Sequence, residues 1–286
     1  MGLSRSITRG LTALFDRPGT RGVLAAALPA LGRAMGTGLD SLRFDDGWVH
    51  RAGGLAFVEH KPRLRSKATA KRTRHYWGYL YEPKDGDVIV DVGAGYGWEA
   101  LYYARKVGPS GRVIAIEAHP GLAAMLERSV QLNGFDQVTC LNYAVAEKRG
   151  TLFIEDDLAH HLGNAVIGTE EAGLPVEAIS LDELAGQLGL GRIDFIKMNI
   201  EGAERLAIEG MGEVIKRTAV VAISCHDFKF ERTGNPFFRT RAAVERWVAD
   251  HGLIHVPRPS EHGPVRDQVN AYNPALVDPA QLNNAR

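Results

Sequence analysis

The chain has 286 residues, 45% of them hydrophobic and 24% charged, a composition typical of a soluble globular protein with one large α/β domain or one domain with an appendage. No apolar stretch reaches the ~18–20 residues of a membrane-spanning helix. The two cysteines, Cys140 and Cys225, are too few for a disulfide framework and have no metal-ligand spacing, so they indicate buried, reduced thiols in a cytoplasmic protein.

The net charge is zero but unevenly distributed. Residues 1–86 hold 15 Lys/Arg and 7 Asp/Glu, whereas residues 87–286 hold 19 and 27. The basic part could contact a membrane surface, nucleic acid or the acidic body of the same protein, or it could be an ordinary solvated surface. Residues 1–40 predict helical packing or a cap over a site, with a peripheral membrane contact as the alternative. Residues 42–58 alternate around two glycine turns and predict a hairpin.

We therefore expect an N-terminal extension at 1–62 (a helical segment plus a hairpin) and a main domain at 63–286. The main domain opens with a basic, aromatic helix at about 63–81. Single-stranded nucleic acid could bind such a segment, although packed aromatics under a solvated basic face explain it as well.

The rest of the main domain alternates strands and helices, the pattern of a parallel, doubly wound sheet. Strands are predicted at 88–92, 112–117, 138–142, 193–198 and 219–225, and helices at 98–107, 121–133, 181–188, from about 204 to 216, and 241–251. An extra strand pair, 151–154 and 176–179, flanks a loop that holds His160 and His161. Strands at 253–256 and 268–272 could end the sheet as an antiparallel hairpin.

The first core strand leads into a glycine-rich turn. It ends in Asp91 and continues as Gly93-Ala94-Gly95-Tyr96-Gly97. Glycines at this place let the chain turn sharply and let a ligand approach the main chain, although a strand-to-helix turn can need glycine for geometry alone. The spacing is shorter than the G-x-G-x-x-G of dinucleotide sites and resembles motif I of S-adenosylmethionine (AdoMet) methyltransferases. Glu117 ends the next strand, where a carboxylate can accept hydrogen bonds from ribose hydroxyls in AdoMet and NAD sites alike.

Together with the blocks Gly108–Glu117, Asn142–Ala146 and especially Ile193–Glu204, this turn resembles the FkbM family of AdoMet-dependent methyltransferases over residues 87–226. The resemblance implies an α/β class I methyltransferase (Rossmann-like) fold, with a seven-stranded, mostly parallel sheet and helices on both faces. It also implies AdoMet as cofactor and O-methylation of a hydroxyl on a small metabolite or sugar. By position, the cofactor contacts would be Asp91, Gly93, Ala94, Gly95, Tyr96, Gly97, Glu99, Glu117, Ala118, Asn142 and Ala144.

The expected catalytic residues are His226, Asn199 and Glu201, which follow two neighbouring strands. A hydroxyl acceptor must lose its proton, and the ordinary pKa of histidine suits His226 to that task. The family commonly has aspartate where this chain has Asn199, and an amide can only orient a partner by hydrogen bonds. Glu201 could bind substrate or cap a helix, and His160 or His161 could be the base instead. No metal-ligand spacing is present, so no metal is predicted.

Three other functions stay open on the sequence. The first is a methyltransferase-like domain that binds a ligand without catalysis, which Asn199 supports. The second is an RNA methyltransferase that uses the basic segment. The third is a nicotinamide oxidoreductase, which the glycine spacing disfavours. The expected partner is a small hydroxyl-bearing acceptor rather than nucleic acid. The sequence predicts neither the acceptor's identity nor the oligomeric state.

Overall fold

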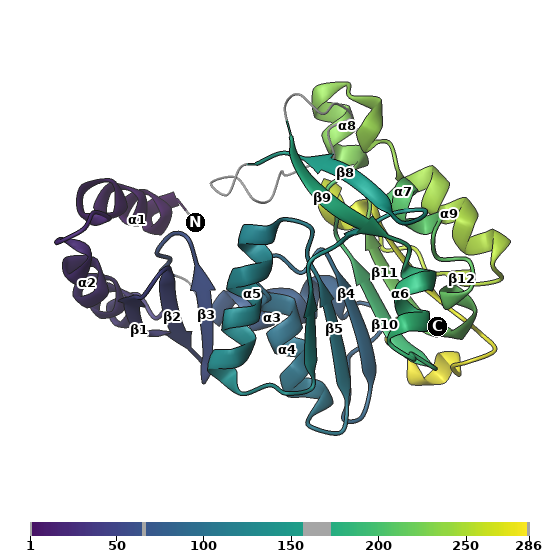
Figure 1. Ribbon diagram of the computed structural model, residues 1–286, viewed down its shortest axis with the longest axis horizontal. Coiled ribbons are helices and arrows are strands. Elements are labelled where there is room, and N and C mark those ends of the chain that lie inside the picture. Colours follow the sequence, from purple (N-terminus) through teal and green to yellow (C-terminus); the bar gives the residue numbers. More distant parts are fainter. Residues whose placement is uncertain (1, 65–66, 157–172, 285–286) are drawn as a thin grey trace.

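A seven-stranded sheet forms the centre of the computed structural model, which describes residues 2–64, 67–156 and 173–284 (Figure 1). Its order is β12-β13-β11-β10-β4-β5-β6. These are β4 (Val88–Val92), β5 (Arg112–Ile116), β6 (Val138–Leu141), β10 (Ile193–Met198), β11 (Thr218–Ser224), β12 (Ile254–His255) and β13 (Gln268–Tyr272). The five strands from β11 to β6 run parallel, and β13 is antiparallel to both of its neighbours. The predicted seven-stranded, mostly parallel sheet is confirmed.

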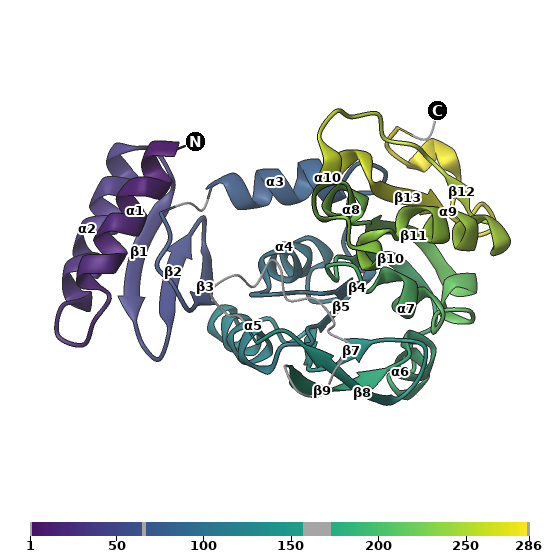
Figure 2. The ribbon, with the colours of Figure 1, turned by 90° about the horizontal axis from the view of Figure 1, so that it is seen from above.

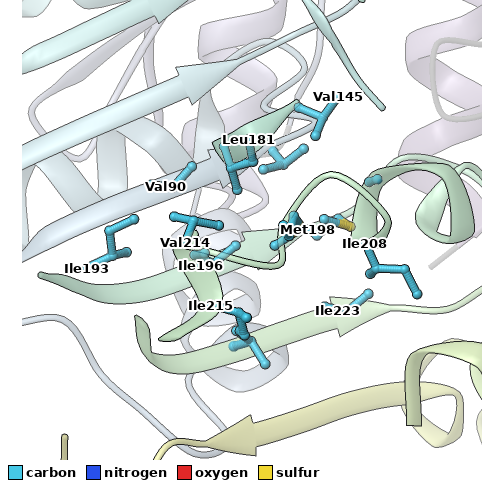
Figure 3. Packing of buried hydrophobic residues seen from close by; sticks show 14 of the residues in the cluster. Val90, Val145, Leu181, Ile193, Ile196, Met198, Ile208, Val214, Ile215 and Ile223 are labelled. Carbon is cyan, nitrogen blue, oxygen red and sulfur yellow. The ribbon is translucent and has the colours of Figure 1, made fainter. Parts of the chain in front are cut away.

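The strands are apolar on both sides because helices cover both faces of the sheet. One apolar cluster joins one face to α6 (Leu181–Gln187), α7 (Glu204–Ile208) and α9 (Arg241–Asp250). Figure 3 shows part of it, including Val90, Ile196 and Ile223 from three adjacent strands. A second cluster joins the other face to α3 (Lys67–Trp77), α4 (Trp98–Val107) and α5 (Pro120–Asn133). Alternation along a strand therefore decides on which face each residue lies.

The region after β10 differs from the prediction. A helix to about residue 216 was expected, but α7 ends at Ile208 and a separate 3-10 turn, η2, covers Val214–Arg217. Gly210 follows α7, and a Cβ there would lie 2.2 Å from the carbonyl oxygen of Ala146, so the chain runs directly against residues 146–147 where the predicted helix would have continued. The Asp182 carboxylate then accepts from the amide of Val214 at 2.6 Å and starts the 3-10 turn.

Two further helices, α8 (Asp227–Thr233) and α10 (Gly263–Arg266), and a 3-10 turn, η3 (Pro236–Phe238), were not predicted. The expected extra strand pair is present as β8 (Gly150–Ile154) and β9 (Leu174–Ile179), which pair antiparallel. They form a separate three-stranded sheet with β7 (Ala144–Val145).

Residues 2–59 form two helices and a small antiparallel sheet that lie to one side of the core (Figure 2). The elements are α1 (Gly2–Phe15), α2 (Arg21–Ala34), β1 (Leu39–Phe44), β2 (Trp48–Ala52) and β3 (Leu55–Glu59). Leu24, Leu28 and Trp48 belong to an apolar cluster of their own. No helix among the described residues is long and apolar enough to cross a membrane.

Side chains of α5 attach this small sheet to the core. The outer edge of β3 has backbone groups that no strand pairs. The amide of Ala56 instead donates to Asn133 Oδ1 at 2.9 Å, and Asn133 Nδ2 donates back to the Ala56 carbonyl at 2.7 Å. The amide of Val58 donates to Ser129 Oγ at 2.9 Å. The contact is therefore specific as well as apolar.

Candidate active site

The strand order reverses between β4 and β10, where β5 and β6 extend the sheet to one side and β11 to the other. Open α/β sheets bind ligands at the carboxyl ends of strands at such a point. A cavity of about 1620 Å³ lies there, between Gly93–Tyr96 after β4, residues 199–201 after β10 and residues 224–229 after β11. Residues of α3 and of the segment 258–265 line it as well. A typical site for one ligand holds roughly 300–1,000 Å³, so this cavity has room for a cofactor and an acceptor together.

The first glycine of the turn is required by the neighbouring strand. Gly93 has φ +75°, and a Cβ there would lie 2.1 Å from the carbonyl oxygen of Asn199. Gly97 has φ +86°, and a Cβ would lie 2.4 Å from a methyl carbon of Leu126. Gly95, at φ +56°, has open space where its side chain would be. Two glycines are thus needed for packing, and the third leaves the main chain accessible to a ligand.

Asp91 lies beneath the cavity rather than on its wall. It is fully buried, and Lys197 Nζ is 2.7 Å from its carboxylate. Asp91 and Lys197 are partners in the β4–β10 ladder, and both point to the face covered by α3 and α4. Lys197 also donates to the Gly93 carbonyl at 2.8 Å and lies over the Trp77 ring. Lys197 lines the cavity, so the ion pair fixes the glycine turn from beneath it. Of the acids predicted to contact the cofactor, Glu99 lines the cavity.

Glu117 is hydrogen-bonded to the glycine turn. Its Oε2 accepts from the amide of Gly95 at 2.8 Å, and its Oε1 accepts from the amide of His119 at 2.9 Å. Burial raises the pKa of Glu117, and these amides oppose the shift. Asn142 Nδ2 donates to the carbonyls of Glu117 and Ala118 at 2.8 Å each. None of Glu117, Ala118, Asn142 and the buried Ala144 lines the cavity, and Glu117 is connected to it through the amide of Gly95.

His226 lies between two carboxylates. Its Nδ1 is 2.9 Å from Glu204 Oε1, and its Nε2 is 3.4 Å from Glu201 Oε2. Burial by itself would lower the pKa of His226, but Glu204 and Glu201 outweigh it and raise that pKa to about 9. The two carboxylates therefore favour the protonated ring, which carries a positive charge and can donate from both nitrogens.

Glu201 connects His226 to Lys229 and Asn199, and these four residues form the polar cluster of the site. Lys229 Nζ contacts Glu201 Oε2, and Asn199 Nδ2 lies 3.5 Å from Glu201 Oε1. Burial alone would raise the pKa of Glu201, but its partners His226 and Lys229 hold that pKa below its usual value. Glu201 has a left-handed backbone, φ +58°, which is strained for a side chain of this kind and is typical of functional sites. The structure thus brings Asn199, Glu201 and His226 together at one cavity, as the sequence predicts.

Two charged residues of the site, Lys197 and Glu204, were not predicted. A lysine inside an apolar strand is a usable signal, because it must find an acid on a neighbouring strand. Glu204 is fully buried and holds His226, yet in sequence it resembles any acid in the first turn of a helix. His160 and His161 lie outside the described residues. Within the described ranges no three His, Cys, Asp or Glu side chains are arranged to hold a metal ion.

The part of the cavity wall that α3 and residues 258–265 form was not predicted either. Arg258 donates to the carbonyls of His75 and Tyr76, both at 2.8 Å, and to Gln268 Oε1 at 3.2 Å. It therefore holds the carboxyl end of α3 against the core, where helix carbonyls have no partner of their own. These residues are far apart in the sequence, so no local pattern predicts the contact.

The segment that ends β3 reaches the same turn. His60 Nδ1 contacts the Tyr96 hydroxyl, and the two rings stack with centroids 5.7 Å apart. Arg63 pairs with the buried Glu59 and lies over the Trp98 ring at 4.8 Å. The N-terminal sheet thus contacts the start of α4 and one end of the cavity.

Comparison with known proteins agrees with this site. The model of the methyltransferase FkbM domain matches residues 91–266. Among curated relatives, the hexuronic acid methyltransferase AglP of Haloferax volcanii is 26% identical over 148 residues, 51% of this chain and 59% of that protein. A protein-L-isoaspartate O-methyltransferase of Methanopyrus kandleri is 38% identical over 58 residues, 20% of this chain. The match spans only 26% of the length of that relative.

Solved structures of similar shape include a methyltransferase FkbM from Methylobacillus flagellatus, with a TM-score of 0.43 and 18% identity, covering 67% of this chain and 44% of that one. An O-methyltransferase from Bacillus cereus has a TM-score of 0.44 and 10% identity, covering 94% and 97%. The family match spans more than half of the chain and includes both the glycine turn and the cluster around His226. The chain belongs to the FkbM methyltransferase family, and its central domain has the class I fold of AdoMet-dependent methyltransferases.

Proposed function

We propose that this protein transfers a methyl group from AdoMet to an oxygen atom of a small acceptor, such as a metabolite or a sugar. The observation that carries the proposal is one cavity that joins the accessible glycine turn to the polar cluster of Glu201 and His226. The names of the relatives, an O-methyltransferase and a hexuronic acid methyltransferase, support an oxygen acceptor.

The residues at the turn fit AdoMet. Gly95 leaves open space at the main chain, Glu99 offers a carboxylate for an ammonium group, and Glu117 keeps unused lone pairs for ribose hydroxyls. AdoMet, when bound, supplies a methyl group on a positively charged sulfur. We expect Gly93–Gly97 and Glu99 to hold its methionine part, and Glu117 with Ala118, Asn142 and Ala144 to hold its adenosine part.

On the acceptor side the chain has to place an oxygen in line with the methyl group, and most of the rate comes from that positioning. We expect His226 and Glu201 to orient the acceptor as a fixed ion pair, with Asn199 as a neutral hydrogen-bonding partner. A hydroxyl acceptor would still have to release its proton. The residues that could accept it are His226, when its ring is neutral, and His160 or His161.

Calorimetry of AdoMet and of its demethylated product, S-adenosylhomocysteine, tests this proposal. Both should bind and raise the melting temperature, and NADH should do neither. The variant Glu117→Ala should lose most of the ligand-induced shift, whereas Glu147→Ala, which changes an exposed acid outside the cavity, should retain it. Absence of binding at millimolar concentration of both AdoMet compounds would reject the function.

A binding domain without catalysis is the second candidate, because Asn199 can neither accept a proton nor replace a carboxylate. Methyl transfer to any acceptor would remove it. We further propose that residues 1–62 are an extension that packs beside a main domain of residues 63–286. A cytoplasmic location and a peripheral membrane contact through residues 1–40 stay predictions from the sequence.

A further inference from the structure

We propose that the acceptor carries an anionic group, a carboxylate or a phosphate, which binds Lys71 and Arg258 on the wall formed by α3 and residues 258–262. This inference rests on the proposed function and names the class of its substrate. It follows from the charges around the cavity and from which of those charges already have partners.

The cavity wall is basic. Of the described residues that line it, six are Lys or Arg and three are Glu. The basic ones are Arg63, Lys71, Arg74, Lys197, Lys229 and Arg258, and the acidic ones are Glu82, Glu99 and Glu201. The imidazolium of His226 lines the same space. A cleft lined by one sign of charge concentrates ligands of the opposite sign.

Four of these cations already have a carboxylate partner. Lys197 pairs with Asp91, Lys229 with Glu201, Arg63 with Glu59, and Arg74 with Glu82. Their charge is largely compensated, so they do not by themselves require a ligand.

Lys71 and Arg258 differ, since neither forms an ion pair with any residue that the structure describes. Lys71 is exposed at the cavity. Arg258 is partly buried, and its described partners are two carbonyls, an amide oxygen and the Tyr79 ring at 4.9 Å, all of them uncharged. A guanidinium has more N–H groups than these three hydrogen bonds use. It therefore keeps its charge and further N–H donors, which a carboxylate or phosphate can accept.

Bound AdoMet would make an anionic acceptor more favourable still. AdoMet carries a sulfonium, an ammonium and a carboxylate, so it brings a net positive charge into a cavity that is already basic. An anionic acceptor would balance this charge, whereas a neutral one would leave Lys71 and Arg258 uncompensated beside it. Two exposed histidines on the same wall, His75 and His262, add no negative charge.

The test measures binding of three sugars to the protein saturated with S-adenosylhomocysteine, at low ionic strength. The probes are D-glucuronate, glucose 6-phosphate and D-glucose, which share a ring and differ in charge. We expect at least one of the two anions to bind about tenfold more tightly than glucose, as a charge-assisted contact predicts, and the stronger of the two identifies carboxylate or phosphate. Equal or weaker binding of both anions would overturn the inference.

Two variants separate a local contact from general attraction. Lys71→Glu changes an exposed side chain without a described partner and should reduce the preference for the anion by about threefold or more. Lys148→Glu makes the same change at an exposed site away from the cavity and should leave the preference intact. If both variants act alike, the contact at Lys71 does not exist. If AdoMet itself fails to bind, the proposed function fails, whereas AdoMet binding with a preferred neutral sugar rejects only the anionic acceptor.

Discussion

Replacing Lys197 by methionine should strongly destabilise the fold, because it leaves the Asp91 carboxylate alone in the core. Asp91 has no exposed surface, and Lys197 is 2% exposed with its Nζ 2.7 Å away. Breaking a buried ion pair by removing one partner costs about 3–5 kcal/mol. Here the variant also removes the donor to the Gly93 carbonyl at 2.8 Å. We therefore expect a loss of about 4 kcal/mol in the free energy of unfolding, read from urea denaturation of the protein without ligand.

The double variant Asp91→Leu/Lys197→Met is the matched control. It removes both charges and places apolar side chains of similar volume at the site, so it should be more stable than Lys197→Met alone. If Lys197→Met costs less than about 1 kcal/mol, which is the range of an exposed pair, the pair is not a buried one in solution. A double variant that loses the sum of the two single effects would also contradict the reasoning.

Three further predictions concern the site and its support. The pKa of His226 is raised from 6.5 to about 9, so the folded protein binds more protons than the unfolded chain between these values. Its stabilising contribution should be complete below about pH 6.5 and vanish as the pH rises through about 9, and His226→Asn should flatten this dependence in urea titrations at pH 6–10. Gly93→Ala should abolish S-adenosylhomocysteine binding measured by calorimetry, since its Cβ would overlap the carbonyl of Asn199, whereas Gly95→Ala has space for the methyl group and bears only the strain of a left-handed backbone, so it should retain the fold. Asn133→Ala leaves the amide of Ala56 unpaired and should cost about 1–3 kcal/mol, and it should speed amide exchange in β3 more than in β4.

The strands of the central sheet could be predicted because each core strand is a short apolar run between turn signals. The helix after β10 was placed too far along the chain, because nothing local shows that Gly210 passes within contact distance of Ala146. The helix α8 was missed for a similar reason, since its start depends on Asp227 accepting from the amides of Thr240 and Arg241, more than ten residues away.

The candidate site was also predicted only in part. The glycines, the acids at strand ends and His226 could be placed at the site because they directly follow strands. Asn199, Glu201 and His226 could be grouped for the same reason. The protonation of His226 could not be predicted, because its pKa depends on Glu204, which lies on a different element of the fold. The role of Arg258 at the site could not be predicted, because it depends on contacts with α3, which lies about 180 residues earlier in the chain.

The contact between His60 and Tyr96 gives the N-terminal sheet a thermodynamic relation to the cavity. Tyr96 is a lining residue of the cavity, and His60 directly follows β3. Linkage is reciprocal, so a ligand that binds more tightly when Tyr96 is stacked on His60 also strengthens the docking of residues 2–59 by the same free energy. In that case the cofactor-bound fraction and the protection of the N-terminal segment from proteolysis are coupled, and each should rise when the other rises.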